Sequence, residues 1–269
     1  MIPLSERKKS LPTLSVQLYS VRDQIAADQP GTLARLAELG FRHVEPFGLG
    51  SLGKSQAERL AATRELRADL DAAGLAVSAV HAALPSVAEL AEECAELGAD
   101  TAFIPHPRQV PGFGENTFTD AAAVDAFADA LGQAVAEAPD ELALGYHNHW
   151  FEWAELPTGP AYDRFWQRTH RGLLAELDVY WAVAAGADPG EVLRALGDRV
   201  TAVHLKDGPA LRDAPQTPLG SGALDVDAVL TAVAEIPWHV AEIDTTDLDP
   251  YSLLADNAAV LRTHGATST

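Results

Sequence analysis

The chain alternates helix-like and strand-like segments, and this alternation limits the possible fold more than any other feature of the sequence. Segments with helical periodicity, such as LARLAELG, end at a glycine or another helix breaker, and a short apolar run such as FRHVEPF follows. Eight strands and eight helices are predicted in this way, from LSVQLYSV near the N-terminus to a last helix near residues 249–263. Because such alternation favours parallel strands with right-handed crossovers, we predict an α/β fold: one closed (β/α)8 TIM barrel.

An open, doubly wound sheet is the alternative fold for the same pattern. It usually carries a glycine-rich nucleotide loop after its first strand, whereas VQLYSVRDQ contains no glycine. No linker or change in composition divides the chain. We therefore predict an N-terminal tail over residues 1–11 and a single barrel domain over residues 12–265.

Acidic residues outnumber basic residues, with 39 Asp and Glu against 19 Lys and Arg, and the net charge is −20. A field of this sign repels phosphate backbones and anionic membranes, so we expect neither nucleic acid nor a membrane as partner. The chain contains no apolar run of the ~18 residues that span a bilayer, and the N-terminus lacks an apolar signal segment. These features predict a cytoplasmic protein.

Polar side chains end the predicted strands, and histidine is concentrated among them, with five of the nine histidines of the chain. The strand-end residues are Gln17, Glu45, His81, His106, His147, His149, Asp178, His204, Lys206, Glu242 and Asp244. Because the active site of such a barrel lies at the C-terminal ends of its strands, we expect these side chains to surround one site. Four of them could bind the hydroxyl groups of a polyol, or each could make only a local hydrogen bond: Gln17, Glu45, His81 and His106.

Strand parity predicts which of these side chains converge. Alternate residues of a strand face the barrel interior, and the small residue Gly145 shares that face with His147. Four consecutive strands would bring together His147, Asp178, His204 and Glu242. Two carboxylates with imidazoles form a site for one divalent cation, and mixed N/O ligation suits Mn²⁺, Co²⁺, Fe²⁺, Ni²⁺ or Zn²⁺ better than Ca²⁺. Without a cation, these residues would be separate polar caps on their strands.

His149 follows His147 by two residues, on the same predicted strand face. Neutral imidazole binds metal ions, and imidazole with a pKa near ~6.5 transfers protons, so we assign His147 to the metal and His149 to the substrate. The alternative for His149 is a hydrogen bond that orients a metal ligand. Glu242 could ligate the cation and also remove a proton from a carbon next to a carbonyl.

Lys206 and Trp181 are further candidates near the predicted site. The ammonium of Lys206 could stabilise an enediolate or bind a substrate oxygen, or it could form a salt bridge with one of three carboxylates, Glu176, Asp178 or Asp207. Trp181 follows the sixth predicted strand, and aromatic walls are common in sugar sites, although such residues more often belong to the core. We include Trp181 among the substrate-binding candidates.

Five segments carry a resemblance to a known family: VEPFG, YHNHWFEW, LAELDVYWAVAAGADPGEVLRALGDRVTAVHLKDG, PLGSGALDVDAVL and VAEID. Through them, the chain resembles the xylose isomerase-like TIM barrels of the sugar phosphate isomerase/epimerase superfamily. The resemblance covers nearly the whole chain. HLKDG after an LDV strand is typical of the group that includes inosose dehydratases and keto-sugar epimerases.

The resemblance also implies a set of metal ligands. In the family, a Glu on strand five, an Asp on strand six, a His on strand seven and a Glu on strand eight hold one metal ion. The last three match Asp178, His204 and Glu242. His147 stands where the strand-five Glu is usual, so the fourth ligand is His147 or, alternatively, His149 or Glu152. Glu152 also resembles a family glutamate near the substrate, and we include it among the catalytic candidates.

The resemblance and the strand-end residues together predict a divalent-metal-dependent sugar or keto-sugar isomerase/epimerase, with Mn²⁺ as the expected ion. An inosose dehydratase-like lyase on a keto-inositol or keto-sugar is the alternative. Two further alternatives are disfavoured: a sugar-binding barrel without catalysis, and an endonuclease IV-like DNA repair enzyme, which would need a basic face. The family resemblance also allows a homo-oligomer.

Overall fold

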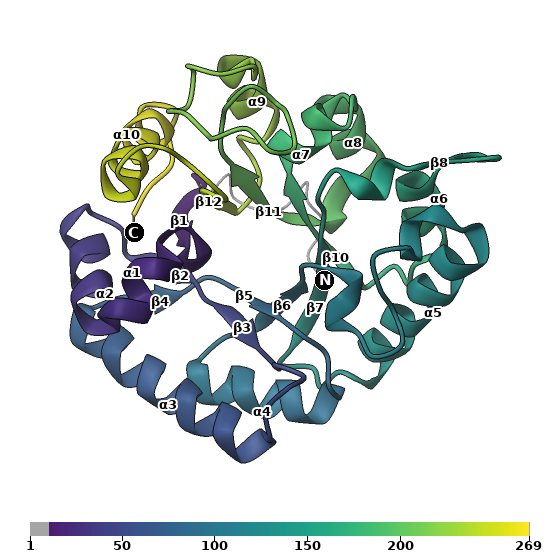
Figure 1. Ribbon diagram of the computed structural model, residues 1–269, viewed down its shortest axis with the longest axis horizontal. Coiled ribbons are helices and arrows are strands. Elements are labelled where there is room, and N and C mark those ends of the chain that lie inside the picture. Colours follow the sequence, from purple (N-terminus) through teal and green to yellow (C-terminus); the bar gives the residue numbers. More distant parts are fainter. Residues whose placement is uncertain (1–10, 269) are drawn as a thin grey trace.

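Ten strands form one parallel sheet that closes on itself in a computed structural model, which describes residues 11–268 (Figure 1). β2 (His43–Glu45) and β3 (Phe47–Leu49) are two parts of one barrel strand, and β4 (Ala76–Val77) and β5 (Val80–Ala82) are two parts of the next. The other strands are β1 (Thr13–Gln17), β6 (Thr101–Ile104), β7 (Ala143–His147), β10 (Leu174–Asp178), β11 (Val200–Leu205) and β12 (Trp238–Ala241). Because β12 pairs with β1 and β1 with β2, the described residues form the predicted eight-stranded barrel.

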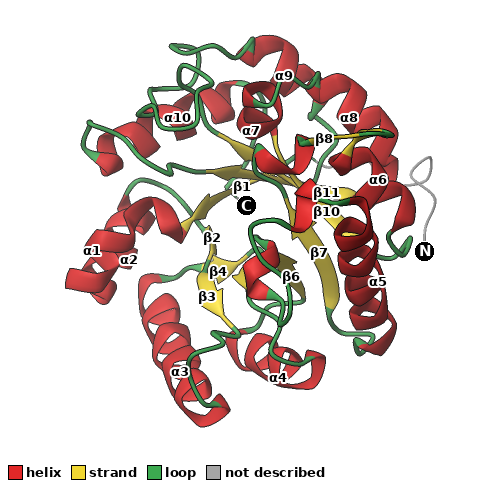
Figure 2. Cartoon of the chain, turned by 45° about the vertical axis from the view of Figure 1, so that its right-hand side comes forward, coloured by secondary structure: helices red, strands yellow, loops and turns green. Residues whose placement is uncertain are grey.

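Helices follow the strands and form a ring around the barrel (Figure 2). They are α1 (Arg22–Ala27), α2 (Gln29–Glu38), α3 (Gln56–Ala73), α4 (Val87–Leu97), α5 (Ala121–Glu137), α6 (Ala161–Arg168), α7 (Val179–Ala184), α8 (Pro189–Leu196), α9 (Val226–Ala232) and α10 (Pro250–Thr263). The predicted α/β barrel is therefore confirmed. The expected tail falls almost wholly on residues 1–10, which lie outside the described residues.

Helix boundaries follow from capping residues in the sequence. Ser55 begins α3 with a capping box, in which its side chain accepts from the backbone of Glu58 and the Glu58 side chain accepts in return. Gly74 and Gly98 end α3 and α4 in the left-handed conformation, with φ of 69° and 79°. Glycine adopts this conformation without the steric penalty of a Cβ, and it therefore stops both helices before the next strand.

The lower part of the barrel interior is closed by apolar side chains. Ala79, Phe103 and Ala202 form a small buried cluster there, apart from the main core between sheet and helices. A Cβ on Gly145 would meet the Phe103 ring at 2.4 Å, so the absence of a side chain on β7 makes room for this ring. Residues two positions further along the same strands, including His147 and His204, begin the polar part of the interior.

A two-stranded hairpin follows the fifth barrel strand and was not predicted. β8 (Glu155–Leu156) pairs antiparallel with β9 (Gly159–Pro160), and Figure 1 shows β8 projecting from the ring of helices. Pro157 and the positive φ of Gly159 produce the turn between the two strands. Within the described part of the chain, the helices are too short or too polar for any of them to cross a membrane.

Candidate metal centre and active site

A cavity of ≈ 490 Å³ opens at the C-terminal ends of the strands. Its wall includes the predicted residues His81, His106, His147, His149, Trp181 and Glu242. The side chains come from barrel strands or from the residues that follow them, because the C-terminal ends of parallel strands meet at one rim. The structure therefore brings these six predicted residues to one site.

The four predicted metal ligands converge at this cavity, two of them on its wall and two behind it. They are His147, Asp178, His204 and Glu242, all buried, and one ligand atom from each lies within 4.8 Å of the others. Three of them are strand residues of β7, β10 and β11, and Glu242 directly follows β12. Parity and strand order account for this convergence. We call these four residues the outer group.

Lys206 lies among the carboxylates next to the outer group. Its Nζ is 2.7 Å from Asp178 Oδ2, 2.5 Å from Glu242 Oε2 and 2.6 Å from Asp244 Oδ2. The surrounding carboxylates outweigh the effect of burial and hold the pKa of Lys206 well above its ordinary value. The structure therefore contains the salt bridge between Lys206 and Asp178 that the sequence analysis gave as an alternative. Asp207 is not a partner, since its carboxylate accepts from the backbone of Gly208 and other loop residues.

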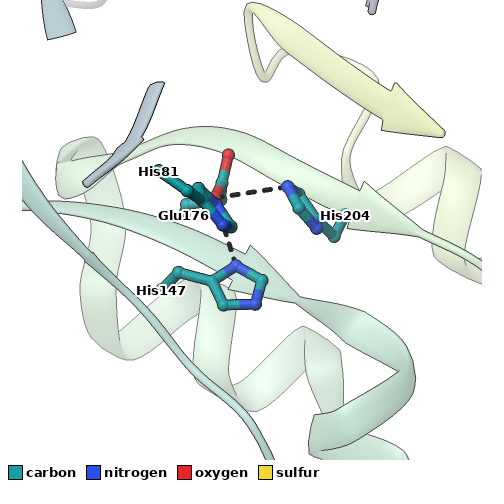
Figure 3. Close-up of side chains that lie close together, drawn as sticks. All are labelled: His81, His147, Glu176 and His204. Atoms are coloured by element: carbon teal, nitrogen blue, oxygen red, sulfur yellow. Dashed lines mark hydrogen bonds and ion pairs between the residues drawn. The ribbon is translucent and has the colours of Figure 1, made fainter. Parts of the chain in front are cut away.

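Glu176 joins three imidazoles, those of His81, His147 and His204 (Figure 3). Its Oε2 lies 2.5 Å from His81 Nε2, 3.1 Å from His147 Nδ1 and 3.2 Å from His204 Nε2. Glu45 Oε2 lies 2.8 Å from His204 Nε2 and 3.4 Å from His81 Nε2. We call Glu45 and Glu176 the inner pair. Sequence reasoning named Glu176 only as a possible ion-pair partner of Lys206 and not as a site residue, although it stands two residues before Asp178 on the same face of β10.

The charges of the outer group and the inner pair do not balance without a further cation or protons. Burial raises the pKa of Glu45 and that of Asp178 to about 7, while the surrounding carboxylates raise the pKa of His204 well above its usual range despite burial. Burial and the neighbouring His204 lower the pKa of His147 to about 3, so His147 keeps a lone pair. Glu45 Oε1 and Glu176 Oε1 are buried and lack a hydrogen-bond partner within residues 11–268. The two imidazoles and two carboxylates of the outer group are suitable ligands for a divalent cation, and its charge would offset the negative charge of the surrounding carboxylates.

Besides Asp178, His204 and Lys206, three further predicted site residues lie behind the cavity rather than on its described wall: Gln17, Glu45 and Glu152. Gln17 Nε2 donates to Glu45 Oε2 at 2.8 Å, and Gln17 Oε1 accepts from Tyr19 N. Glu152 accepts from Tyr146 Oη at 2.7 Å and from the His149 backbone N–H at 2.9 Å. Burial raises the pKa of Glu152 to about 8. Through these hydrogen bonds, Gln17 holds the carboxylate of Glu45 and Glu152 holds the backbone of His149.

His149, His106 and Trp181 lie on the cavity wall, where the sequence analysis expected them. Burial, together with the proximity of His147 and Lys206, lowers the pKa of His149 well below its ordinary value. His149 Nδ1 has no hydrogen-bond partner in the described part of the chain, so it is available to a ligand. His106 Nδ1 accepts from the Arg108 backbone, and burial lowers the pKa of His106 to about 4.

Other residues of the cavity wall were missed by sequence reasoning. Tyr19 and Phe47 meet edge to face at the mouth, with ring centroids 5.3 Å apart, and both are partly exposed. The guanidinium of Arg212 lies 4.9 Å from the Trp150 ring centroid on the same wall. Tyr19 and Phe47 each stand two residues after a polar strand end, Gln17 and Glu45 respectively, and this spacing is the signal in the sequence that could have identified them.

Comparison with known proteins gives one family match. The model of a family described as "Xylose isomerase-like TIM barrel" matches residues 33–264. No curated protein matches the chain significantly.

Solved structures share the fold over almost the whole chain. A sugar phosphate isomerase/epimerase from Parabacteroides distasonis is 22% identical with a TM-score of 0.71, and 99% of each chain is covered. A 3-keto-D-glucoside 4-epimerase from E. coli is 16% identical with a TM-score of 0.61, over 94% of this chain and 99% of that one. A protein named as a probable 3-DHS dehydratase from Bacillus anthracis is 15% identical with a TM-score of 0.62, over 93% and 98%. At these identities, the likeness establishes the fold.

Proposed function

Since the chain belongs to the xylose isomerase-like TIM barrel family, we propose that it is a divalent-metal-dependent isomerase or epimerase of a sugar or keto-sugar. The observation that carries this proposal is the outer group, in which two imidazoles and two carboxylates converge beside a cavity. The cavity is large enough for a small-molecule ligand. The solved structures named as epimerases have the same barrel.

The proposed cation is held by the outer group, with Mn²⁺ as the first candidate and Co²⁺, Fe²⁺, Ni²⁺ or Zn²⁺ as the others. When bound, such an ion polarises the carbonyl and hydroxyl oxygens of a keto-sugar and so acidifies the C–H bond between them. The mixed nitrogen and oxygen donors argue against Ca²⁺, which prefers oxygen ligands alone.

Glu242 and His149 are the proposed proton-transfer groups, because both lie on the cavity wall. One of them takes the proton from the carbon next to the carbonyl, and the bonding electrons form an enediolate. Return of a proton to the opposite face of that carbon gives an epimer, and return to the neighbouring carbon gives an isomer. Lys206 lies 2.5 Å from Glu242 and adds positive charge beside the developing anion.

A dehydratase acting on a keto-inositol or keto-sugar is the second candidate. The observation that favours it is the second acid–base group on the wall, His149, whose Nδ1 lacks a described protein partner. Glu242 abstracts the proton from carbon and passes it to the β-hydroxyl, which leaves as water while a hydrogen bond to His149 orients it. The solved structure named as a dehydratase has the same fold.

Elemental analysis of the purified protein tests the proposal. We expect one equivalent of a transition metal in the wild type and its loss in Asp178→Ala and in His204→Ala. His239→Ala is the matched control, because His239 is equally buried but hydrogen-bonds the Val233 carbonyl away from the site. A wild type that stays metal-free after incubation with Mn²⁺, Co²⁺ and Zn²⁺ would refute the proposal.

The two reaction outcomes are separated by incubation with keto-sugars in D₂O. Isomerisation or epimerisation incorporates solvent deuterium at a carbon, and the sugar keeps all of its oxygen atoms. Dehydration instead gives a product that has lost one water molecule. Binding of a sugar without exchange or turnover would instead indicate a sugar-binding barrel without catalysis.

A further inference from the structure

His204 lies between a carboxylate of the outer group and a carboxylate of the inner pair. Its Nδ1 is 2.7 Å from Glu242 Oε2, and its Nε2 is 2.8 Å from Glu45 Oε2. The ring is fully buried, so both nitrogens interact with protein and not with solvent. One nitrogen of His204 therefore serves the outer group and the other serves the inner pair.

His147 has the same arrangement on β7, which is separated from β11 by β10. Its Nδ1 lies 3.1 Å from Glu176 Oε2 in the inner pair, and its Nε2 lies 3.9 Å from Asp178 Oδ2 in the outer group. Figure 3 shows the His147 and His204 rings directed at Glu176 from two sides. Both imidazoles thus turn one nitrogen inward and one outward.

We propose that Glu45 and Glu176 are positioning residues that select the tautomers of His204 and His147 for cation binding. A neutral imidazole has one N–H and one lone pair. If His204 donates Nε2–H and His147 donates Nδ1–H to the inner pair, the lone pairs of His204 Nδ1 and His147 Nε2 face the outer group. A carboxylate behind a ligating imidazole fixes its orientation and makes it a stronger ligand. This inference rests on the proposed metal-dependent function.

The surroundings hold the inner pair in place for this role. Gln17 Nε2 donates to Glu45 Oε2 at 2.8 Å, and the amide of Gln17 is itself fixed through the Tyr19 backbone. The His81 ring stacks on the His204 ring with centroids 5.2 Å apart and an interplanar angle of 4°. His81 Nε2 also lies 2.5 Å from Glu176. Neither carboxylate can rotate away without breaking one of these contacts.

A cation bound to the inner pair is the rival use of the same atoms. It would need lone pairs on His204 Nε2 and His147 Nδ1, and a neutral imidazole that provides one there must carry its proton on the outward nitrogen. The two arrangements are therefore mutually exclusive for neutral rings. The inner site, formed by His81, His147, Glu176 and His204, also reaches the wall through its imidazoles. The outer position is favoured because it offers two carboxylates, of which Glu242 lies on the cavity wall, whereas the single carboxylate of the inner four, Glu176, lies off the wall.

Calorimetric titration with Co²⁺ tests the proposal in the full-length protein and in Glu176→Gln and Glu45→Gln. We expect one equivalent in all three, with affinity 10–100-fold weaker in both variants. Glu93→Gln is the control, since Glu93 is a buried carboxylate bonded to Arg59 and the Gly50 backbone outside the site. Its affinity should equal that of the wild type.

Nitrogen-15 NMR of the histidine rings in Zn²⁺-loaded wild type gives a readout that needs no substitution. We expect His204 to be protonated at Nε2 and His147 at Nδ1. The opposite tautomers, unchanged Co²⁺ affinity in folded Glu176→Gln and Glu45→Gln, or two equivalents in the wild type with one lost in Glu176→Gln would each overturn the proposal. A wild type that binds no Co²⁺ overturns the proposed function itself, whereas equal affinities overturn only the positioning role.

Discussion

At the scale of single residues, Lys206 stands out because its ammonium occupies the space between carboxylates that are also proposed to hold a metal ion. Asp178, Glu242 and Asp244 all lie within 2.7 Å of Nζ. A divalent cation on Asp178 and Glu242 and an ammonium at this distance repel each other strongly. Metal uptake should therefore shift Lys206 away from the outer group.

The Lys206→Met variant separates two effects of this ammonium: it stabilises the metal-free protein, and it competes with a bound metal ion. Without metal, the variant leaves three carboxylates uncompensated, and we expect the free energy of unfolding to fall by roughly 3 kcal/mol. With the competing charge removed, Mn²⁺ should bind at least about tenfold more tightly. Thermal unfolding of the metal-free protein and calorimetry with Mn²⁺ check the two expectations. Lys54→Met, at an exposed position, is the control, and weaker Mn²⁺ binding in Lys206→Met would contradict the argument.

At the scale of the elements, the position of β7 depends on the absence of a side chain at Gly145. A Cβ there would lie 2.4 Å from Phe103 Cδ1 and 3.0 Å from the Leu174 carbonyl oxygen. The strand would have to move, and with it His147, which is two residues further along the same face. Packing in the lower barrel and the geometry of the outer group are therefore linked through one strand.

Gly145→Ala should lower the free energy of unfolding by about 1–3 kcal/mol, because overpacking forces side chains and backbone from their places. Mn²⁺ affinity should fall as well, since His147 moves. Gly132→Ala on α5 is the matched control: its Cβ would meet His170 Cβ at 3.5 Å, an ordinary contact, and alanine favours the helix. Denaturant unfolding and metal titration of both variants measure the effects. Equal stabilities for the two variants would be evidence against the link.

Much of the element order could be predicted from the sequence, because hydrophobic periodicity and glycine breakers are local signals. Parity likewise predicted which side chains of β7, β10 and β11 face inward. Parity does not tell how deep a residue lies, so Glu176 was missed and Glu45 was expected at the cavity wall. The division of β2 from β3 at Pro46 and the hairpin of β8 and β9 depend on backbone pairing, which periodicity does not report.

At the scale of the whole molecule, the charge of −20 sets the class of ligand that the cavity can attract. A negative field raises the local concentration of cations and disfavours polyanions, so it suits uptake of a divalent ion with a neutral sugar. The basic residues near the mouth are few. Arg108 is paired with Glu115 at 2.9 Å, and Arg212 packs over Trp150, so the described cavity wall carries no cluster of unpaired basic side chains.

Binding to DNA is therefore expected to be absent, and this distinguishes the proposed sugar enzyme from a DNA repair enzyme built on a related barrel. Duplex DNA requires lysine and arginine contacts to many phosphates, and affinity gained in that way rises steeply as salt is lowered. Fluorescence anisotropy with a labelled duplex containing an abasic site, at 50 and 200 mM salt and with Mn²⁺ or Zn²⁺ present, should show no binding at either concentration. Binding that strengthens at the lower salt concentration would reveal phosphate contacts that the net charge of −20 argues against. It would replace the sugar substrate proposed above with a nucleic acid.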